Sequence, residues 1–118
     1  MTEVSGDDPT AERIARNDAI FRAANERISG VAAEQEMQEG VPFLCECADP
    51  TCREIVVLAL REYEEIRAES RRFFNIPGHE RSDRPYQRVV ARNDRYHVHE
   101  KLGRAGEVAD ELDPRVRA

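Results

Sequence analysis

The chain has 118 residues, of which 40% are hydrophobic and 36% are charged, and its mean hydropathy is −0.71. This length predicts one domain at most, and so hydrophilic a composition leaves a thin core of the kind that often needs a metal ion, a disulfide or a partner chain. No apolar run approaches the roughly 20 residues of a membrane span, and the acidic N-terminus does not resemble a signal peptide, so we expect a cytoplasmic protein. The net charge of −6 argues against general binding to nucleic acids.

The N-terminal third of the chain predicts a long helix. Residues 1–8 are polar and acidic and are expected to be disordered. Asp8 suits the N-cap of a helix, and Pro9 suits its first position. Because Gly40 begins a strong stop signal, the helix is expected to cover residues 9–39.

The apolar positions of this predicted helix raise the question of what covers them. Ile14, Phe21 and Ile28 follow one another at intervals of seven, which makes the helix amphipathic. Such a stripe can pack within its own domain. Alternatively it is a contact surface for an unknown protein partner or a homodimer, with Asn17 setting the register as polar residues do in coiled coils.

Residues 41–102 predict an α+β region around a cysteine-rich turn. Two extended stretches, PFLCECA and REIVVLAL, flank the turn, and the second contains Ile55–Leu58 as a buried strand. A helical pattern in LREYEEIRAESRRFF follows, then a strand in FFNIPGH and a hairpin in RPYQRVVARNDRYHVHEKL. We therefore expect one α+β domain with antiparallel strands over residues 9–102, and a loosely attached tail over residues 103–118.

All three cysteines of the chain, Cys45, Cys47 and Cys52, fall within eight positions. An odd number of clustered thiols is more typical of a metal or redox site than of a disulfide framework. Asp49 and Pro50 form a turn signal that folds the third thiol back toward the first two. Three thiolates on a tight turn suit a tetrahedral ion such as zinc, which takes four ligands in a closed structural site.

The best fourth ligand is His79, which directly follows a Pro-Gly turn signal at the end of a predicted strand. Other candidates are His97, His99, Asp49 or a water molecule. A Cys3His site with one zinc ion per chain would add the stability that a thin core lacks. The alternatives are free thiols that pack as small hydrophobic residues and a thiol redox pair.

The chain resembles, from about Asn17 to Lys101, a family of short uncharacterised proteins common in actinobacteria. The motifs that carry the resemblance are an NER-type helix, F-x-C-E-C-x-D-x-x-C, E-Y-E-x-x-R, P-G-H-E and a final V-x-E-K, which reads VHEK here. The resemblance implies that the family signature is the set Cys45, Cys47, Cys52 and His79. It implies no activity.

These observations favour a small non-enzymatic zinc-binding protein that acts as an interaction or regulatory module. A zinc hydrolase with Glu80 as base beside His79 is not favoured, because three thiolates make zinc a poor Lewis acid. One alternative is nucleic-acid binding through residues 71–95, where seven arginines oppose three acidic residues. Another is a thiol redox or zinc-responsive switch at Cys45 and Cys47.

Overall fold

The computed structural model of the chain describes residues 9–80 and 85–115, so the disorder expected for residues 1–8 lies outside the described residues. The elements in chain order are α1 (Pro9–Glu34), β1 (Val41–Leu44), β2 (Ile55–Leu58), α2 (Leu60–Arg67), β3 (Arg72–Asn75), β4 (Gln87–Arg92), β5 (His97–Lys101) and α3 (Gly103–Glu111). They form two small antiparallel sheets, one with the order β1-β2 and one with the order β3-β5-β4. This arrangement confirms the predicted α+β class, with its N-terminal helix, second helix and C-terminal hairpin.

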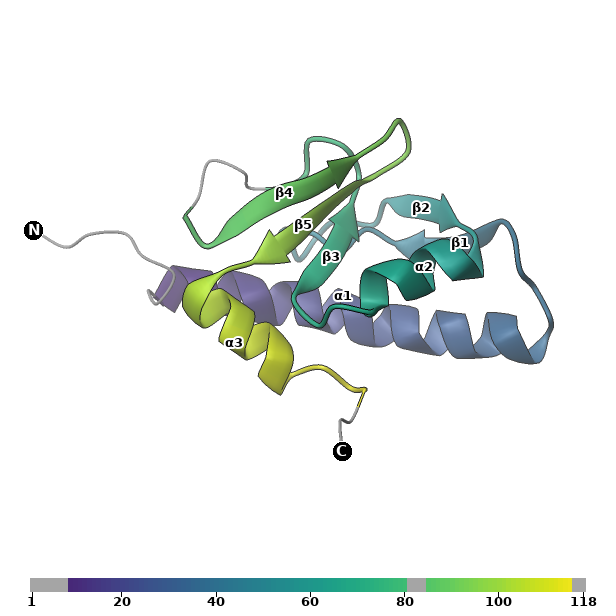
Figure 1. Ribbon diagram of the computed structural model, residues 1–118, viewed down its shortest axis with the longest axis horizontal. Coiled ribbons are helices and arrows are strands. Elements are labelled where there is room, and N and C mark those ends of the chain that lie inside the picture. The colour runs from purple at the N-terminus through teal and green to yellow at the C-terminus, as the bar shows by residue number, and fades with distance from the viewer. Residues whose placement is uncertain (1–8, 81–84, 116–118) are drawn as a thin grey trace, which may run out of the picture.

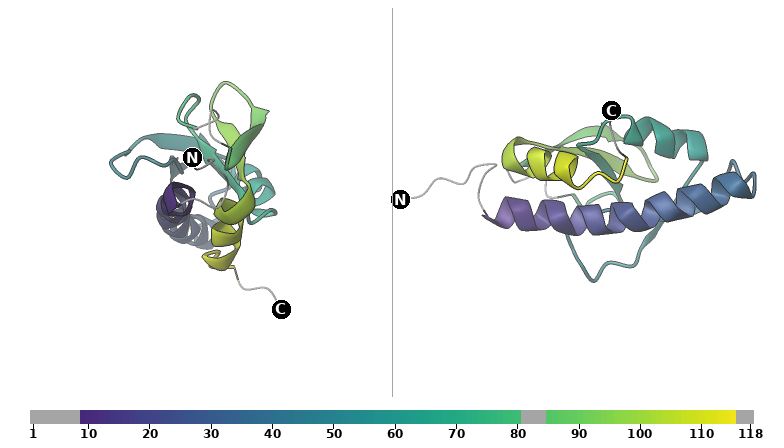
Figure 2. Two further views of the ribbon diagram at one scale, coloured as in Figure 1. Left: turned by 90° about the vertical axis from the view of Figure 1, so that its left-hand side faces the viewer. Right: turned by 90° about the horizontal axis from the view of Figure 1, so that it is seen from below.

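Helix α1 runs along the length of the molecule, and the two sheets lie to one side of it (Figures 1 and 2). Ile14 and Phe21 are buried within the chain, and Ile28 is partly buried against the main core. Asn17 donates to the backbone oxygen of Ala48 and not to a second helix. The chain thus covers the first two positions of the stripe itself, so the expectation that a partner or a second copy covers the stripe loses its main support and stays a prediction.

The boundary of α1 differs from the predicted one. The helix ends at Glu34, and a turn follows in which Glu36 and Gly40 both have positive φ angles, of 57° and 66°. Gly40 adopts this conformation without the steric cost that a side chain brings. Gly40, which was expected to end the helix, lies instead in the connection that leads into β1.

Strands β1 and β2 pair in the register Val41↔Leu58 to Leu44↔Ile55. Val56 and Leu58 point into the core, whereas Ile55 and Val57 are 48% and 47% exposed. The prediction of a buried strand is right for one face only, because a two-stranded ribbon has one face on the core and the other in solvent. Burial therefore alternates along Ile55–Leu58, although all four residues are aliphatic and the sequence shows no alternation.

The main core is an aromatic cluster beneath this ribbon. The rings of Phe43 and Tyr63 stack with their centroids 4.4 Å apart, and Phe74 meets both edge-on at 6.1 Å. These three rings come from β1, α2 and β3, so a few large side chains join three short elements. Edge-to-face and offset contacts of this kind are favourable beyond the area they bury.

The C-terminal segment is an integral part of the fold and not the loose tail that was expected for residues 103–118. Helix α3 buries Ala105, Val108 and Ala109 completely, and the first two pack with Ala11 and Ile14 of α1. The segment looked weakly apolar because its buried residues are small. Small side chains nevertheless suffice here, since they let two helices approach closely. Residues 116–118 lie outside the described residues.

A stripe of polar side chains, Asp18, Arg22 and Asn25, is buried on α1. Their spacing of four and three residues places them on one helical face. Arg22 is 0% exposed, and its guanidinium donates to the backbone oxygens of Ser70 and Arg72, where α2 passes into β3. Each residue of this stripe, which we call the polar stripe of α1, reaches a different part of the chain.

Asp18 ties α1 to β5. Its Oδ2 atom lies 2.6 Å from the Nζ atom of Lys101 and 3.1 Å from Nε2 of His99, and all three side chains are at most 1% exposed. Lys101 also donates to Oε1 of Gln87 at 2.6 Å. Burial disfavours the Asp18 carboxylate, but the charges of Lys101 and His99 outweigh it and hold the pKa of Asp18 below its usual value.

We expect Asp18→Asn to destabilise the protein by about 3–5 kcal/mol at pH 7, because it leaves the buried ammonium group of Lys101 without its counter-charge. The gap between wild type and variant should begin to narrow as the pH falls below about 3.8, because the carboxyl of the unfolded wild type then takes up a proton, and it should close only below the lower pKa of the folded state. Urea unfolding of both proteins at several pH values measures this. Glu65→Gln, a like change at an exposed position, should alter stability by less than about 0.5 kcal/mol. Equal stability of Asp18→Asn and wild type would show that the ion pair contributes nothing.

Candidate metal centre

The three cysteines lie on the loop that joins β1 to β2. Cys45 continues the β1–β2 ladder through a hydrogen bond from its N–H to the oxygen of Glu54. Asp49 then shapes the turn, because its side chain accepts hydrogen bonds from the N–H and hydroxyl of Thr51 and its carbonyl accepts one from the N–H of Cys52. The Asp-Pro turn signal thus folds Cys52 back toward the start of the loop, as the sequence predicts.

His79 reaches the same place from β3. The strand ends at Asn75, and the N–H of His79 bonds to the oxygen of Ile76 at 2.9 Å to close a tight turn. Gly78 has a φ angle of 93° in this turn, a conformation that a side chain would strain. The Pro-Gly signal therefore aims the imidazole at the cysteines.

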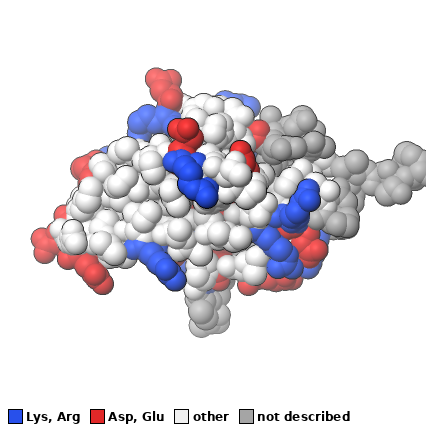
Figure 3. Space-filling model, turned by 180° about the vertical axis from the view of Figure 1, so that it is seen from behind, with Lys and Arg blue, Asp and Glu red and all other residues white. Residues whose placement is uncertain are grey.

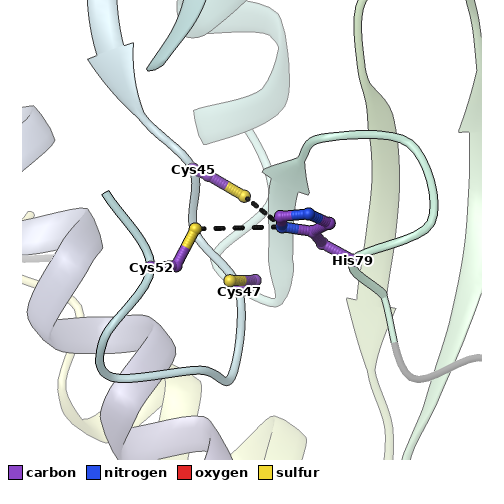
Figure 4. A group of neighbouring side chains, drawn as sticks. All are labelled: Cys45, Cys47, Cys52 and His79. Atoms are coloured by element: carbon purple, nitrogen blue, oxygen red, sulfur yellow. Dashed lines mark hydrogen bonds between the residues drawn. The ribbon is translucent and has the colours of Figure 1, made fainter. Parts of the chain in front are cut away.

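The structure brings Cys45, Cys47, Cys52 and His79 into one cluster, with a ligand atom from each within 4.8 Å of the others. Figure 4 shows the imidazole of His79 facing the three sulfur atoms. Its Nδ1 atom lies 3.6 Å from the Sγ atom of Cys45 and 3.8 Å from that of Cys52. A zinc ion with bonds of about 2.3 Å to sulfur and about 2.0 Å to nitrogen holds such ligands roughly 3.5 Å apart. The four side chains are thus placed as a small tetrahedral cation requires.

The other candidates for the fourth ligand lie elsewhere. Nδ1 of His97 lies 3.1 Å from Oε2 of Glu80, and His99 is held between Asp18 and Asn75 in the interior. The carboxylate of Asp49 accepts the hydrogen bonds of its own turn. His79 is therefore the fourth member of the cluster among the residues that the structure describes.

The three thiols lie so close together that ionisation of one disfavours ionisation of the others. Hydrogen bonding from Cys45 lowers the pKa of Cys47 to about 5, while the same contact and burial raise the pKa of Cys45 far above its usual value. Burial also raises the pKa of Cys52. A divalent cation removes this competition, because it compensates several thiolates at once.

One side of the cluster is enclosed and the other is open. Cys45 and Cys47 are buried, Cys52 is half-buried and His79 is exposed. A small cleft of about 220 Å³ lies against Cys47, Asp49 and His79. Solvent therefore reaches the histidine side, and an ion could enter there without unfolding the loop.

Two buried side chains on the enclosed side fix where the thiols stand, and sequence patterns gave no sign of either. Asn25 of α1 accepts from the N–H of Leu44 at 2.8 Å, donates to its oxygen at 2.9 Å, and donates to Glu46 at 2.9 Å. Glu46 lies between Cys45 and Cys47 and accepts a hydrogen bond from the N–H of Phe74. The cysteine loop is thus tied both to α1 and to β3.

Glu80 holds the turn that carries His79. One carboxylate oxygen accepts from the N–H of Gly78 at 3.1 Å and from the side chain of Asn75 at 2.7 Å, and the other contacts His97 at 3.1 Å. These contacts occupy the carboxylate, so its geometry fits a positioning residue and not a base acting on a bound water. Only the position next to His79 in the sequence hints at this.

No protein-family model, no curated protein and no solved structure matches this chain. The resemblance to the actinobacterial family therefore stays a prediction. None of the helices in the described ranges combines the length and the apolar composition needed to cross a membrane.

We expect Glu80→Ala to weaken metal binding by the cluster about 10- to 100-fold, the usual effect of removing a group that orients a ligand. Titration with Co²⁺, followed by its visible absorption in a tetrahedral thiolate site, measures the affinity. Glu69→Ala, at an exposed position after α2, is the matched control. The metal-saturated variant should keep the wild-type circular dichroism and cobalt spectrum, so that only the affinity changes. An unchanged cobalt affinity would rule out this role for Glu80.

Proposed function

We propose that this chain is a small non-enzymatic zinc-binding protein that binds one Zn²⁺ through Cys45, Cys47, Cys52 and His79. The observation that carries the proposal is the convergence of three sulfur atoms and one imidazole nitrogen, from two separate loops, to within 4.8 Å. Softness of the donors also favours zinc, since thiolates select it over Mg²⁺ or Ca²⁺.

A structural role suits this ligand set better than a catalytic one. Four protein ligands complete a tetrahedral shell, whereas catalytic zinc usually keeps a position open for water. The bound ion would join the β1–β2 loop to the turn after β3, beside the hydrogen bond that the N–H of Ile76 donates to Cys45 Sγ at 3.2 Å. The free energy of metal binding would then add to the stability of the folded state, and a chain with so thin a core needs such a contribution.

The role of the zinc-stabilised domain is that of an interaction or regulatory module, and the two alternatives are less well supported. Four of the arginines in residues 71–95 form ion pairs within the chain: Arg71 with Asp110, Arg72 and Arg88 with Glu100, and Arg95 with Glu62. Their charge is therefore largely neutralised, which weakens the case for a phosphate-binding surface. A thiol switch at Cys45 and Cys47 is disfavoured because both are at most 3% exposed.

Elemental mass spectrometry on protein purified without chelator tests the proposal. We expect about one zinc per chain in the wild type and clearly less in His79→Ala, because one of four ligands is lost. Glu69→Ala is the control, since Glu69 is exposed and lies outside the cluster, and it should keep its zinc.

The decisive contrary result is a folded wild-type protein without metal that also takes up no Zn²⁺ or Co²⁺ when it is supplied. The three thiols would then be core residues. Equal loss of zinc in His79→Ala and Glu69→Ala would instead point to a general effect on the fold and would remove the support for a Cys3His ligand set.

A further inference from the structure

Two shallow apolar grooves lie end to end between α1 and the β1 side of the molecule. The first has a volume of about 370 Å³ and runs between Ile20 and Ala24 of α1 and Pro50 of the cysteine loop. The second, of about 340 Å³, runs between Val31 near the end of α1 and Met37 and Pro42. We call the two together the α1–β1 groove.

Exposed hydrophobic side chains line the α1–β1 groove. Ile20 is 67% exposed, Val31 is 53% exposed and Met37 is 39% exposed. Phe21 and Ile28, which are more buried, line the same two grooves beside them. Seen from behind, the molecule shows a broad uncharged area with most of its charged side chains toward the edges (Figure 3). Exposed apolar side chains gathered along a groove of a small hydrophilic protein are typical of an interaction site.

The charges of the groove have one sign. Arg27 lines the second groove and Arg53 the first, and neither groove is lined by an aspartate or glutamate of the described residues. Within the part of the chain that the structure describes, Arg27 forms no ion pair, and Arg53 donates only to the backbone oxygens of Pro50 and Cys52. In a chain with a net charge of −6, this is a local basic apolar surface with unused charge.

We propose that the α1–β1 groove binds an amphipathic helix of another protein whose apolar stripe is flanked by acidic residues. The groove follows α1 from Asn17 to its end and reaches Gln35, which corresponds to about 27 Å at 1.5 Å per residue and so to a partner helix of about 18 residues. Apolar side chains at intervals of three and four would enter the two grooves, as in other helix-in-groove complexes. Carboxylates beside them would pair with Arg27 and Arg53, which sets orientation and partner choice.

Other occupants fit these observations less well. A second copy related by a two-fold axis would place the same basic surface against itself, with arginines facing arginines. An anionic membrane would satisfy the charge, but two concave grooves accept individual side chains and not a flat lipid surface. The inference does not rest on the metal site, although Pro50 and Arg53 belong to or adjoin the turn that carries Cys52.

The probe for this inference is an 18-residue helical peptide with leucines at positions i, i+3, i+4 and i+7 of each two turns and glutamates on the flanks. Fluorescence anisotropy should show that it binds the full-length protein, as purified without chelator, more tightly than a peptide with lysines in place of the glutamates does. The affinity should fall as salt rises, because exposed charge pairs are screened. Val31→Glu and Arg27→Glu should each weaken binding about tenfold or more, which corresponds to about 1.4 kcal/mol.

The controls are exposed positions on β4, away from the groove. Ala91→Glu and Arg92→Glu should each bind like the wild type. The proposal is overturned if the glutamate and lysine peptides bind alike or if Val31→Glu binds as well as Ala91→Glu. It is also overturned if the protein is a dimer that Val31→Glu dissociates, or if it binds phosphatidylserine vesicles but not the acidic peptide.

Discussion

The buried polar stripe of α1 is the constraint on which the rest of this fold depends. Asp18 holds β5, Arg22 holds the passage from α2 to β3, and Asn25 holds the end of β1. A buried charge or amide that lacks its partner costs several kcal/mol, whereas an apolar contact tolerates small shifts. The helix can therefore meet the sheets in only one register, and a thin hydrophobic core suffices once that register is set.

The polar stripe of α1 also positions the candidate metal centre, through Asn25. Asn25 fixes Leu44 and Glu46, and these residues flank Cys45; Glu46 in turn accepts the N–H of Phe74 on β3, the strand that leads to His79. The thiols and the imidazole thus converge because one amide on α1 and one carboxylate between the cysteines hold their two strands side by side. A metal ion bound there would tighten an arrangement that the protein already defines, which is how preorganised sites gain affinity.

Local signals in the sequence were enough to predict the cysteine cluster, the hairpin and the second helix. Asp49-Pro50 and Pro77-Gly78 are turns whose chemistry lies in two adjacent residues, so they could be read without knowing the fold. The partners of Asp18, Arg22 and Lys101 could not, because charged residues are expected in solvent and their burial depends on side chains far away in the chain.

The misread apolar segments have a similar cause. Periodicity shows that Ile14 and Phe21 share a face, but it does not show whether the same chain or another covers them. Ile14 packs against α3, whose buried residues are alanine, glycine and one valine, too small to stand out as an apolar stripe, whereas Phe21 lies toward Leu44 on the β1 side of α1. The contact between α1 and α3 could be predicted only by considering the apolar stripe of the long helix together with the small residues of the C-terminal segment.

The polar stripe of α1 and a bound metal ion would hold different parts of the molecule in place. This difference determines how metal binding would affect partner binding. The polar stripe secures α1, which supplies one wall of the α1–β1 groove, whereas the other wall includes Pro50 and Arg53 of the cysteine loop. That loop has Asp49 and Thr51 exposed and few buried apolar side chains between Cys47 and Cys52, which is the composition of a segment that opens locally at low free-energy cost. Four ligands on one ion would remove this freedom while leaving α1 unchanged. The metal would therefore act on partner binding by ordering one wall of the groove, and its contribution would be largest for partners that contact Pro50 and Arg53 and smallest for those that use only the end formed by Val31 and Met37.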